Sequence, residues 1–376
     1  MTDPRTATPS GEPRARGLGI QFAGEPGPWN AITDVPGVEV GYATLIEGEG
    51  VRTGVTAIHP RGREDAGDPV AAGFHSFNGN GEMTGVSWIE ESGTCAGPIC
   101  ITNTHSVGVV HHAVVRWTTE VHPAVAEGWL LPVVAETWDG YLNDIGGDHV
   151  SISDARAAIE GAASGPLEEG SVGGGTGMNC YHFKGGSGTA SRVVAHGDER
   201  YTVGVFVQTN FGSRGELTIA GVPVGAELLD DDPIETYFEA PPGSGSVIGV
   251  VVTDAPLLPD QCRALARRIV LGIGRTGTAS SHFSGDLFLA VSTANPGAFA
   301  TVAQSFTGTA AAYGELRFVP WVAMDPFFEA VVRATEESVL DSVVANEDMV
   351  GFRGRRSPGL PRDRVVELLR ARGVVP

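Results

Sequence analysis

The Gly245-Ser246 step places a hydroxyl side chain where the backbone could be cut. It ends the segment 228–246, LLDDDPIETYFEAPPGSGS, whose acidic residues and three prolines predict an exposed, flexible linker. A Gly-Ser step in a linker is usually a plain spacer, but here an almost continuous apolar strand begins at the serine. A cut before Ser246 would leave an α-amine beside its hydroxyl. Such an amine can act as the base for that hydroxyl, and its solution pKa of about 7.7–8.0 suits proton transfer near neutral pH.

Other motifs that could indicate a cofactor, a metal site or a catalytic triad give weaker signals. Residues 272–277, GIGRTG, match a dinucleotide-binding motif, but a helix precedes them and a Ser/Thr-rich loop follows, which predicts a loop that ends a helix. Cys95 and Cys100 lack a second pair at zinc-like spacing, and His105 and His112 are about 10 Å apart along a helix. No G-x-S-x-G pentapeptide occurs. We therefore expect no metal and no cofactor.

Composition narrows the class of protein. The chain has 376 residues and a formal net charge of −20, which argues against nucleic acid and anionic membrane surfaces as partners. Its four cysteines are too sparse for a disulfide framework, its N-terminus lacks the apolar core of a signal peptide, and its apolar runs are too short to span a membrane. These features predict a cytoplasmic enzyme.

The elements that would position a site alternate irregularly between strands and helices. Residues 1–25 are polar and proline-rich, which predicts a poorly ordered tail before one catalytic domain, 26–376. Short strands with turns are expected from about residue 30 to 101. Apolar periodicity predicts helices at 107–119, 152–164, 259–271, 325–350 and 362–371, and strands at 200–210, 246–255 and 284–294. We expect Asn210 to lie where its strand runs into a loop, and Gly272 to stop the helix before it. Two packed sheets covered by helices, an α+β layered sandwich, fit this order.

Many motifs in the same order resemble one enzyme family. They include NAITDVPGVEVG, FNGNGEMTG, ITNTHSVGVV, ETWDGYLNDIGG, VGGGTGM, VGVFVQTNFG and SGDLFLAVSTAN. The chain resembles the DmpA/BapA-type aminopeptidases, a family of L-aminopeptidase/D-amino-acid esterases and β-peptidyl aminopeptidases. The resemblance implies a four-layer α/β/β/α sandwich, similar to N-terminal-nucleophile hydrolases but with different connectivity. It also implies self-cleavage at Gly245-Ser246 into chains 26–245 (with the tail) and 246–376, which assemble as a homo-oligomer of two-chain units.

The resemblance also implies roles for individual residues. Ser246 matches the nucleophile, Ser284 and Asp286 of SGD match a polar pair that supports it, and Asn210 of QTN matches the amide that stabilises the oxyanion. Each polar residue has a plainer structural interpretation, as a strand end, a turn or a solvated acid.

Two further positions would contact the substrate. Glu136 of ETW matches the carboxylate that receives the substrate ammonium. Trp138 stands where relatives can carry a tyrosine whose hydroxyl helps at the reacting centre, so this chain lacks that hydroxyl, although Tyr141 is close in sequence. The implied substrates are peptides, amides or esters with a free amino terminus.

Three other functions stay open. One is amide hydrolysis of synthetic oligomers, as in nylon-oligomer hydrolases, and another is acetyl transfer, as in ornithine acetyltransferases. Both related groups use a threonine nucleophile, and none stands at this junction. The third is an uncleaved, non-enzymatic homologue, which would run as a single full-length band on a denaturing gel.

Overall fold

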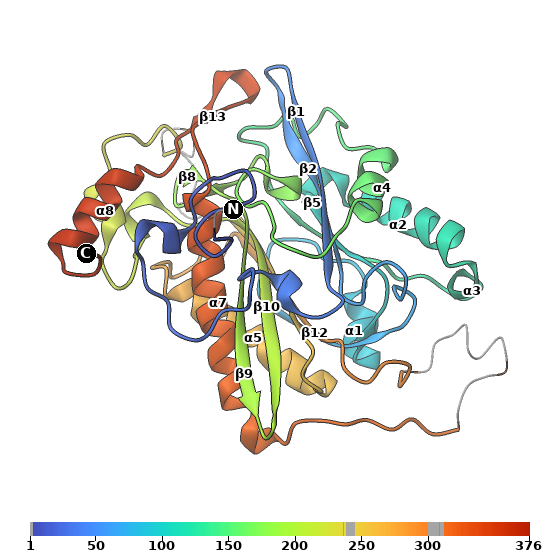
Figure 1. Cartoon of the computed structure of the whole chain (residues 1–376). Coiled ribbons are helices and arrows are strands. Elements are labelled where there is room, and N and C mark those ends of the chain that lie inside the picture. Colours follow the sequence, from blue (N-terminus) through green and yellow to red (C-terminus); the bar gives the residue numbers. More distant parts are fainter. Residues whose placement is uncertain (1–2, 236, 238–244, 300–307, 309–311) are drawn as a thin grey trace.

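Two β-sheets face each other in the computed structural model, which describes residues 3–235, 237, 245–299, 308 and 312–376 (Figure 1). The four-stranded sheet has the order β1-β2-β5-β6 and the six-stranded sheet the order β4-β3-β12-β11-β10-β9. The strands of the first sheet are β1 (Glu39–Glu47), β2 (Val51–His59), β5 (Ile99–Asn103) and β6 (Val133–Thr137). Those of the second are β4 (Thr94–Cys95), β3 (Val70–Gly79), β12 (Ser284–Ser292), β11 (Gly245–Thr253), β10 (Glu199–Asn210) and β9 (Gly186–His196). Two small pairs complete the strands: β7 (Asn179–Cys180) with β8 (Phe183–Lys184), and β13 (Met349–Val350) with β14 (Arg356–Ser357).

Helices cover the outer face of each sheet. The four-stranded sheet packs against α2 (Val107–Val121) and α4 (Ile152–Glu160), and the six-stranded sheet against α5 (Pro259–Gly274) and α7 (Asp325–Val344). A third apolar cluster fills the space between the sheets. This order confirms the predicted four-layer α/β/β/α sandwich. The remaining α-helices described are α1 (Val86–Ser92), α3 (Pro123–Ala126) and α8 (Arg362–Ala371).

Strand β11 lies at the centre of the six-stranded sheet, antiparallel to β10 and parallel to β12. Its side chains alternate as a strand buried on both faces requires. Val247 and Val251 join the cluster under the helices, whereas Ile248 and Val250 join the cluster between the sheets. This confirms the predicted strand. Ser246 follows the same alternation and therefore faces the four-stranded sheet.

The prediction of a poorly ordered tail at residues 1–25 is wrong for residues 3–25. This segment packs on the six-stranded side of the molecule, where Arg14 is only 3% exposed. One guanidinium nitrogen of Arg14 lies 2.8 Å from Asp341 and another lies 2.8 Å from Glu169. A composition rich in arginine and proline is typical of disordered segments. Here the segment is ordered because its arginines pair with buried carboxylates that are distant in the sequence, and local sequence does not reveal these partners.

These contacts belong to a buried ion-pair network between the N-terminal region and α7. Within it, the two carboxylate oxygens of Glu337 form ion pairs with Arg16 Nε at 2.5 Å and with Arg192 Nη2 at 2.6 Å. Because buried charges are stable only when they are paired, the network fixes the N-terminal region on the helix. We call Arg14, Arg16, Glu169, Arg192, Glu337 and Asp341 the buried ion-pair network.

Two smaller predictions also need correction. In the expected linker 228–246, Leu228 and Ile234 are buried and anchor residues 228–235 on the fold, whereas the residues 229–231 between them are exposed as predicted. Residues 236 and 238–244 lie outside the described residues. The helix expected to stop at Gly272 runs on to Gly274. A Cβ atom at Gly272 would lie 2.5 Å from a side-chain atom of Thr335, so this glycine allows α5 and α7 to approach closely.

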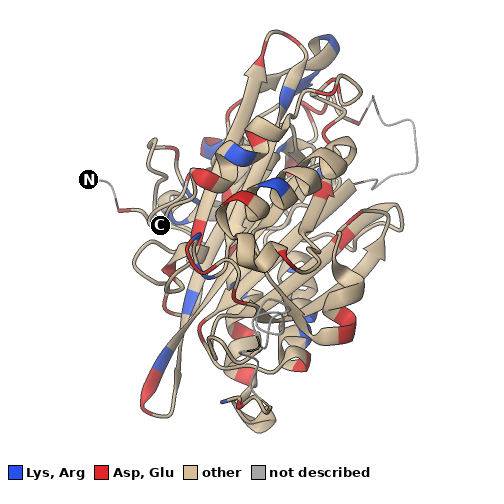
Figure 2. Ribbon diagram, turned by 90° about the vertical axis from the view of Figure 1, so that its right-hand side faces the viewer, with Lys and Arg blue, Asp and Glu red and all other residues tan. Residues whose placement is uncertain are grey.

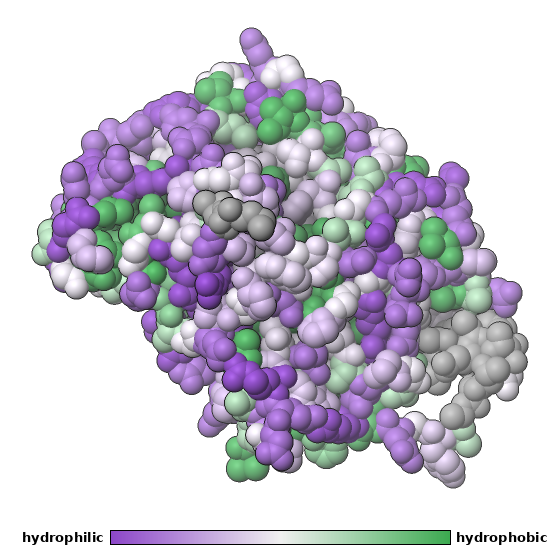
Figure 3. All heavy atoms as spheres, in the orientation of Figure 1, coloured by the Kyte–Doolittle hydropathy of each residue, from purple (hydrophilic) through white to green (hydrophobic). Residues whose placement is uncertain are grey.

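The surface agrees with the acidic composition. Asp and Glu are distributed over loops and helix faces (Figure 2), and apolar residues form small separate patches among hydrophilic ones in the view of Figure 3. In the described part of the chain, none of the helices has the length and apolar character to cross a membrane.

Candidate active site

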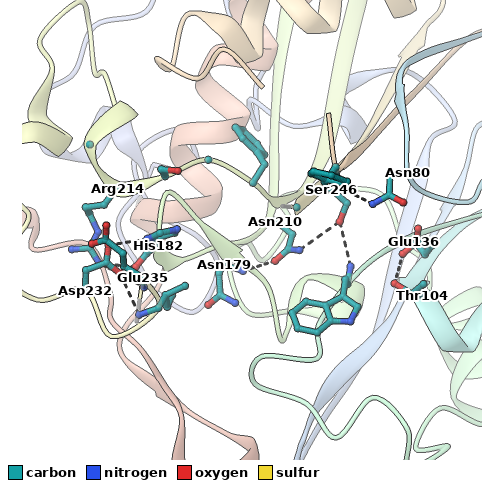
Figure 4. A pocket seen from close by; sticks show the side chains of 18 of the residues that line it. Asn80, Thr104, Glu136, Asn179, His182, Asn210, Arg214, Asp232, Glu235 and Ser246 are labelled. Atoms are coloured by element: carbon teal, nitrogen blue, oxygen red, sulfur yellow. Dashed lines mark hydrogen bonds and ion pairs between the residues drawn. The ribbon is translucent and has the colours of Figure 1, made fainter. Parts of the chain in front are cut away.

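Ser246 is the second residue of β11 and is 2% exposed. Its register partners are Asn210 on β10 and Gly285 on β12. The Oγ atom accepts a hydrogen bond from the backbone N–H of Trp138 at 3.2 Å and lies 3.5 Å from the Nδ2 donor of Asn210 (Figure 4). Two N–H donors, one from the end of β10 and one from the residue that follows β6, therefore converge beside this hydroxyl.

Asn210 is the last residue of β10, so it ends the strand as expected and is still paired within the sheet. The backbone N–H of Asn179 donates to its Oδ1 at 3.0 Å. Because the carbonyl end of the amide is held in this way, its NH2 end is directed to Ser246. An amide held in this orientation can stabilise negative charge that develops next to Oγ.

The Trp138 donor could not be found by sequence reasoning. It is a backbone group, so the only residue-level requirement is that position 138 is not proline. It reaches Ser246 because β6 ends next to the start of β11 across the two sheets. The indole ring itself lines the cavity.

Ser284 and Asp286 lie on β12, on either side of Gly285, and both are buried. The Ser284 hydroxyl donates to Asp286 Oδ1 at 2.5 Å. Asp286 Oδ2 accepts from Asn78 Nδ2 at 2.8 Å and from the Ser280 hydroxyl at 2.6 Å. The predicted pair is thus formed and placed on the neighbouring strand, although no hydrogen bond joins it to Ser246 within the described residues. Asn78 and Ser280 were not expected, because they come from distant or irregular segments.

Glu136, in β6, is 3% exposed. Its Oε1 accepts the backbone N–H of Glu82 at 3.0 Å, and its Oε2 accepts the Thr104 hydroxyl. Burial raises the pKa of Glu136, although the hydrogen bonds from Thr104 and Glu82 act in the opposite direction. Among the described residues no Lys, Arg or His forms an ion pair with it, so its anionic form can accept an ammonium group from outside the chain.

Tyr141 does not replace the hydroxyl that Trp138 lacks. Its hydroxyl donates to the backbone oxygen of Arg356 at 3.0 Å, and its ring packs edge-on against Tyr237. It is not among the described residues that line the cavity. Trp138 therefore contributes a backbone donor and an apolar wall.

Ser246, Asn210, Trp138 and Glu136 line one cavity of about 480 Å³. Ser284 and Asp286 are not among its described lining residues. Figure 4 shows Glu136, Thr104 and Asn80 at one end, Ser246 and Asn210 in the middle, and His182, Asp232, Glu235 and Arg214 at the other. An elongated substrate could therefore lie across the serine with a different chemical environment on each side.

Metal and thiol chemistry have little support in the described residues. No group of three His, Cys, Asp or Glu side chains there could hold a metal ion. The four cysteines are buried and free, and burial raises the pKa of Cys95, Cys100 and Cys180 to about 12, which disfavours the reactive thiolate.

The four-layer sandwich, with a serine at the start of a central strand facing the opposite sheet, places the protein among the N-terminal-nucleophile hydrolase folds. The structure aligns with an L-aminopeptidase D-Ala-esterase/amidase from Ochrobactrum anthropi, described as a prototype serine aminopeptidase and a new variant of that fold. The TM-score is 0.90 at 45% identity, over 97% of this chain and 100% of that one. A β-aminopeptidase from a Burkholderia species aligns with a TM-score of 0.88 at 44% identity, over 96% and 100% of the two chains.

Sequence comparison gives the family. Residues 30–357 match the model of peptidase family S58, and the chain belongs to that family. The β-peptidyl aminopeptidase BapA of Sphingosinicella microcystinivorans is 49% identical over 375 residues, 95% of this chain and 92% of the relative. The BapA of Sphingosinicella xenopeptidilytica is 44% identical, over 96% and 92%. The resemblance and the enzyme class predicted from sequence are confirmed: the protein is a hydrolase of the peptidase type.

Proposed function

We propose that this protein is a self-processing serine aminopeptidase that cuts its own chain between Gly245 and Ser246 and then releases N-terminal residues from substrates with a free amine. The observation that carries the proposal is the set of groups around Ser246. Two N–H donors, from Trp138 and Asn210, converge beside its Oγ. The buried carboxylate of Glu136, which forms no ion pair with any described residue, lies in the same cavity.

Processing begins with attack of Ser246 Oγ on the Gly245 carbonyl. The acyl group moves from nitrogen to oxygen, water hydrolyses the ester, and the products are a Gly245 carboxylate and a free Ser246 amine. Close packing supports this site, because a Cβ atom at Gly245 would lie 2.4 Å from the backbone oxygen of Asn210. Only glycine allows the scissile segment to lie this close to β10.

In each turnover the Ser246 amine accepts the Oγ proton while Oγ attacks the substrate carbonyl. Asn210 Nδ2 and the Trp138 N–H stabilise the oxyanion, and the proton passes to the leaving amine as the bond breaks. Water then releases the acyl group from Oγ. Glu136 holds the substrate ammonium throughout, which limits the reaction to free amino termini.

The names of the relatives support the proposed substrate class. Two of them are named β-peptidyl aminopeptidases and a third an L-aminopeptidase D-Ala-esterase/amidase. We include peptides with N-terminal β-residues among the substrates of this chain. A panel of free-amine p-nitroanilides carrying β-, L-α- and D-α-residues ranks the three preferences.

The proposal also covers assembly and location: chains 26–245 (with the tail) and 246–376 form one catalytic domain, and the two-chain units form a homo-oligomer in the cytoplasm. The buried, unpaired cysteines support a reducing compartment. Light scattering coupled to size exclusion measures the assembly, and a mass equal to one two-chain unit would contradict the oligomer.

Denaturing electrophoresis and N-terminal sequencing test self-processing. The wild-type protein should give two bands, the smaller beginning Ser-Val-Ile-Gly. Ser246→Ala should give one band and no activity, because no hydroxyl can attack Gly245. Ser246→Thr keeps a hydroxyl and should still be processed, more slowly. A smaller band with any other N-terminus, or cleavage of Ser246→Ala at the same bond, would disprove the assignment.

A further inference from the structure

The half of the cavity away from Glu136 has no role in the chemistry described so far. It extends from Asn179, which lies next to Asn210, to His182, Asp232 and Glu235 (Figure 4). We propose that this half is a leaving-group subsite that selects a cationic side chain on the residue after the scissile bond. The inference rests on the proposed function: if Glu136 binds the ammonium, the leaving residue must occupy the opposite side of Ser246.

Asn179 forms the junction between the reacting centre and this subsite. Its backbone N–H holds Asn210, which leaves its side chain free for another task. The Oδ1 atom of Asn179 is buried and accepts no hydrogen bond within the described residues. A buried acceptor without a partner is costly, and here it lines the cavity just beyond the oxyanion position. The N–H of the leaving residue is the donor that a bound substrate would bring to it.

The charged side chains at the end of the cavity away from Glu136 leave an excess of negative charge. Asp232 accepts His182 Nδ1 at 2.8 Å and lies 4.0 Å from a nitrogen of Arg214, so its charge is largely compensated. The two Nη atoms of Arg214 donate to the backbone oxygens of Leu228 and His182, at 3.0 and 2.6 Å. Glu235 lines the same end, and its carboxylate forms no ion pair among the described residues. One negative charge therefore remains for a ligand.

The walls of this end suit the methylene stem of a lysine or arginine. Leu229 and Ile234, which flank Asp232 in sequence, line the cavity together with Phe211, and Leu229 is 59% exposed in the free protein. Long cationic side chains bury their apolar stem along such surfaces while the charge stays at the rim. A glutamate at the same position would bring its carboxylate close to Glu235 and Asp232. The subsite should therefore rank lysine above leucine and leucine above glutamate.

The test uses the processed enzyme and dipeptide amides that share the best-cleaved N-terminal residue and carry Lys, Leu or Glu in second position. The p-nitroanilide of the same N-terminal residue has no side chain at that position. We expect kcat/KM for the Lys substrate to exceed that for the Leu substrate by about three- to fivefold, as for an ion pair that stays partly in water. The advantage should shrink at high salt.

Substitutions at Glu235 test whether this residue causes the preference for the Lys substrate. Glu235→Gln should bring the Lys/Leu ratio close to one, and Glu235→Lys should reverse the order of the Lys and Glu substrates. The matched control is Glu227→Gln, which removes an exposed carboxylate just before this segment that is not among the described residues lining the cavity. It should leave the ratio as in the wild type.

A separate variant tests the contact of the leaving N–H. Asn179→Ala keeps the backbone donor to Asn210 and removes the side-chain amide, including the unpartnered Oδ1. Because an ester has no leaving N–H, the ratio of amide to ester turnover should fall about two- to tenfold in this variant. An unchanged ratio would remove Asn179 from the subsite.

The outcomes separate the two proposals. Turnover of the p-nitroanilide with equal rates for the three dipeptides, or with a Glu preference, would overturn the subsite and leave the proposed function intact. A Lys preference that persists in Glu235→Gln would also overturn it. Failure to cleave any free-amine substrate would overturn the proposed function itself, and the subsite with it.

Discussion

Glu136→Gln tests how strongly the buried carboxylate holds the substrate. The substitution keeps the size of the side chain and removes its charge. In the wild type both oxygens already accept hydrogen bonds, from the Glu82 backbone and from Thr104. The glutamine amide offers only one acceptor oxygen, so one of these donors also loses its partner.

The magnitude follows from the burial of the site. Glu136 is 3% exposed, so its contact with an ammonium is made largely out of water. A hydrogen bond to a charged group contributes about 1.5–3 kcal/mol, which corresponds to about a 10- to 150-fold loss in kcat/KM. The loss should appear in KM and kcat together if the ammonium also orients the substrate carbonyl.

The assay compares kcat/KM of processed wild type and Glu136→Gln on a free-amine p-nitroanilide, with the N-acetylated compound as the uncharged reference. Glu90→Gln, on the exposed face of α1, is the charge-matched control. Thermal unfolding of each variant checks that the fold is kept. Equal turnover of acetylated and free substrates by the wild type, or an unaffected Glu136→Gln, would refute the assigned role.

Three other expectations follow from the same geometry. Asn210→Ala should still be processed and lose mainly kcat, by about 10²–10³, because its donor acts on the transition state; unchanged turnover would exclude it. Since burial raises the pKa of Glu136, KM should rise as pH falls, starting above the value of about 4.3 for an ordinary glutamate; a KM that stays flat to pH 4 would contradict this. Burial, against hydrogen bonds from Thr53 and Asn143, raises the pKa of Asp139 to about 7, above about 3.9 in the unfolded chain. The native state therefore binds the proton more tightly, and stability is lost as pH rises between these values. Asp139→Asn should raise the Tm at pH 8 and give little gain at pH 4; equal differences at both pH values would contradict it.

The sequence was most informative where local pattern and burial agree. The run that begins at Ser246 is apolar at nearly every position, and it forms a central strand with both faces covered. The α2 and α5 helices also follow their apolar periodicity. The helix predicted at 325–350 begins as expected but ends at Val344, and Met349–Val350 form the short strand β13 instead. Fold class and family could be predicted because these elements, and the motifs between them, are local in sequence.

The features that could not be predicted depend on contacts between residues that are distant in the sequence. The segment 3–25 is ordered because Arg14 meets carboxylates more than 150 residues away, as the separations of 155 and 327 show. The Trp138 donor is a backbone group whose position depends on how the two sheets pack. Asn78 joins Asp286 only because β3 pairs with β12. Neither the composition nor the spacing of motifs in the sequence predicts these contacts.

The buried ion-pair network has a consequence for a chain that is cut at Gly245. Arg14, Arg16 and Arg192 would belong to one fragment, and Glu337 and Asp341 to the other. Separating the fragments would leave Glu337 and Asp341 without their arginine partners and leave Glu169 as the only acidic member of the network beside the three arginines. It would also remove β11 and β12 from the middle of a sheet. The two polypeptides therefore share one folding equilibrium. Refolding of the cut protein becomes an association reaction, so its Tm depends on concentration, whereas the uncut chain folds as a single molecule.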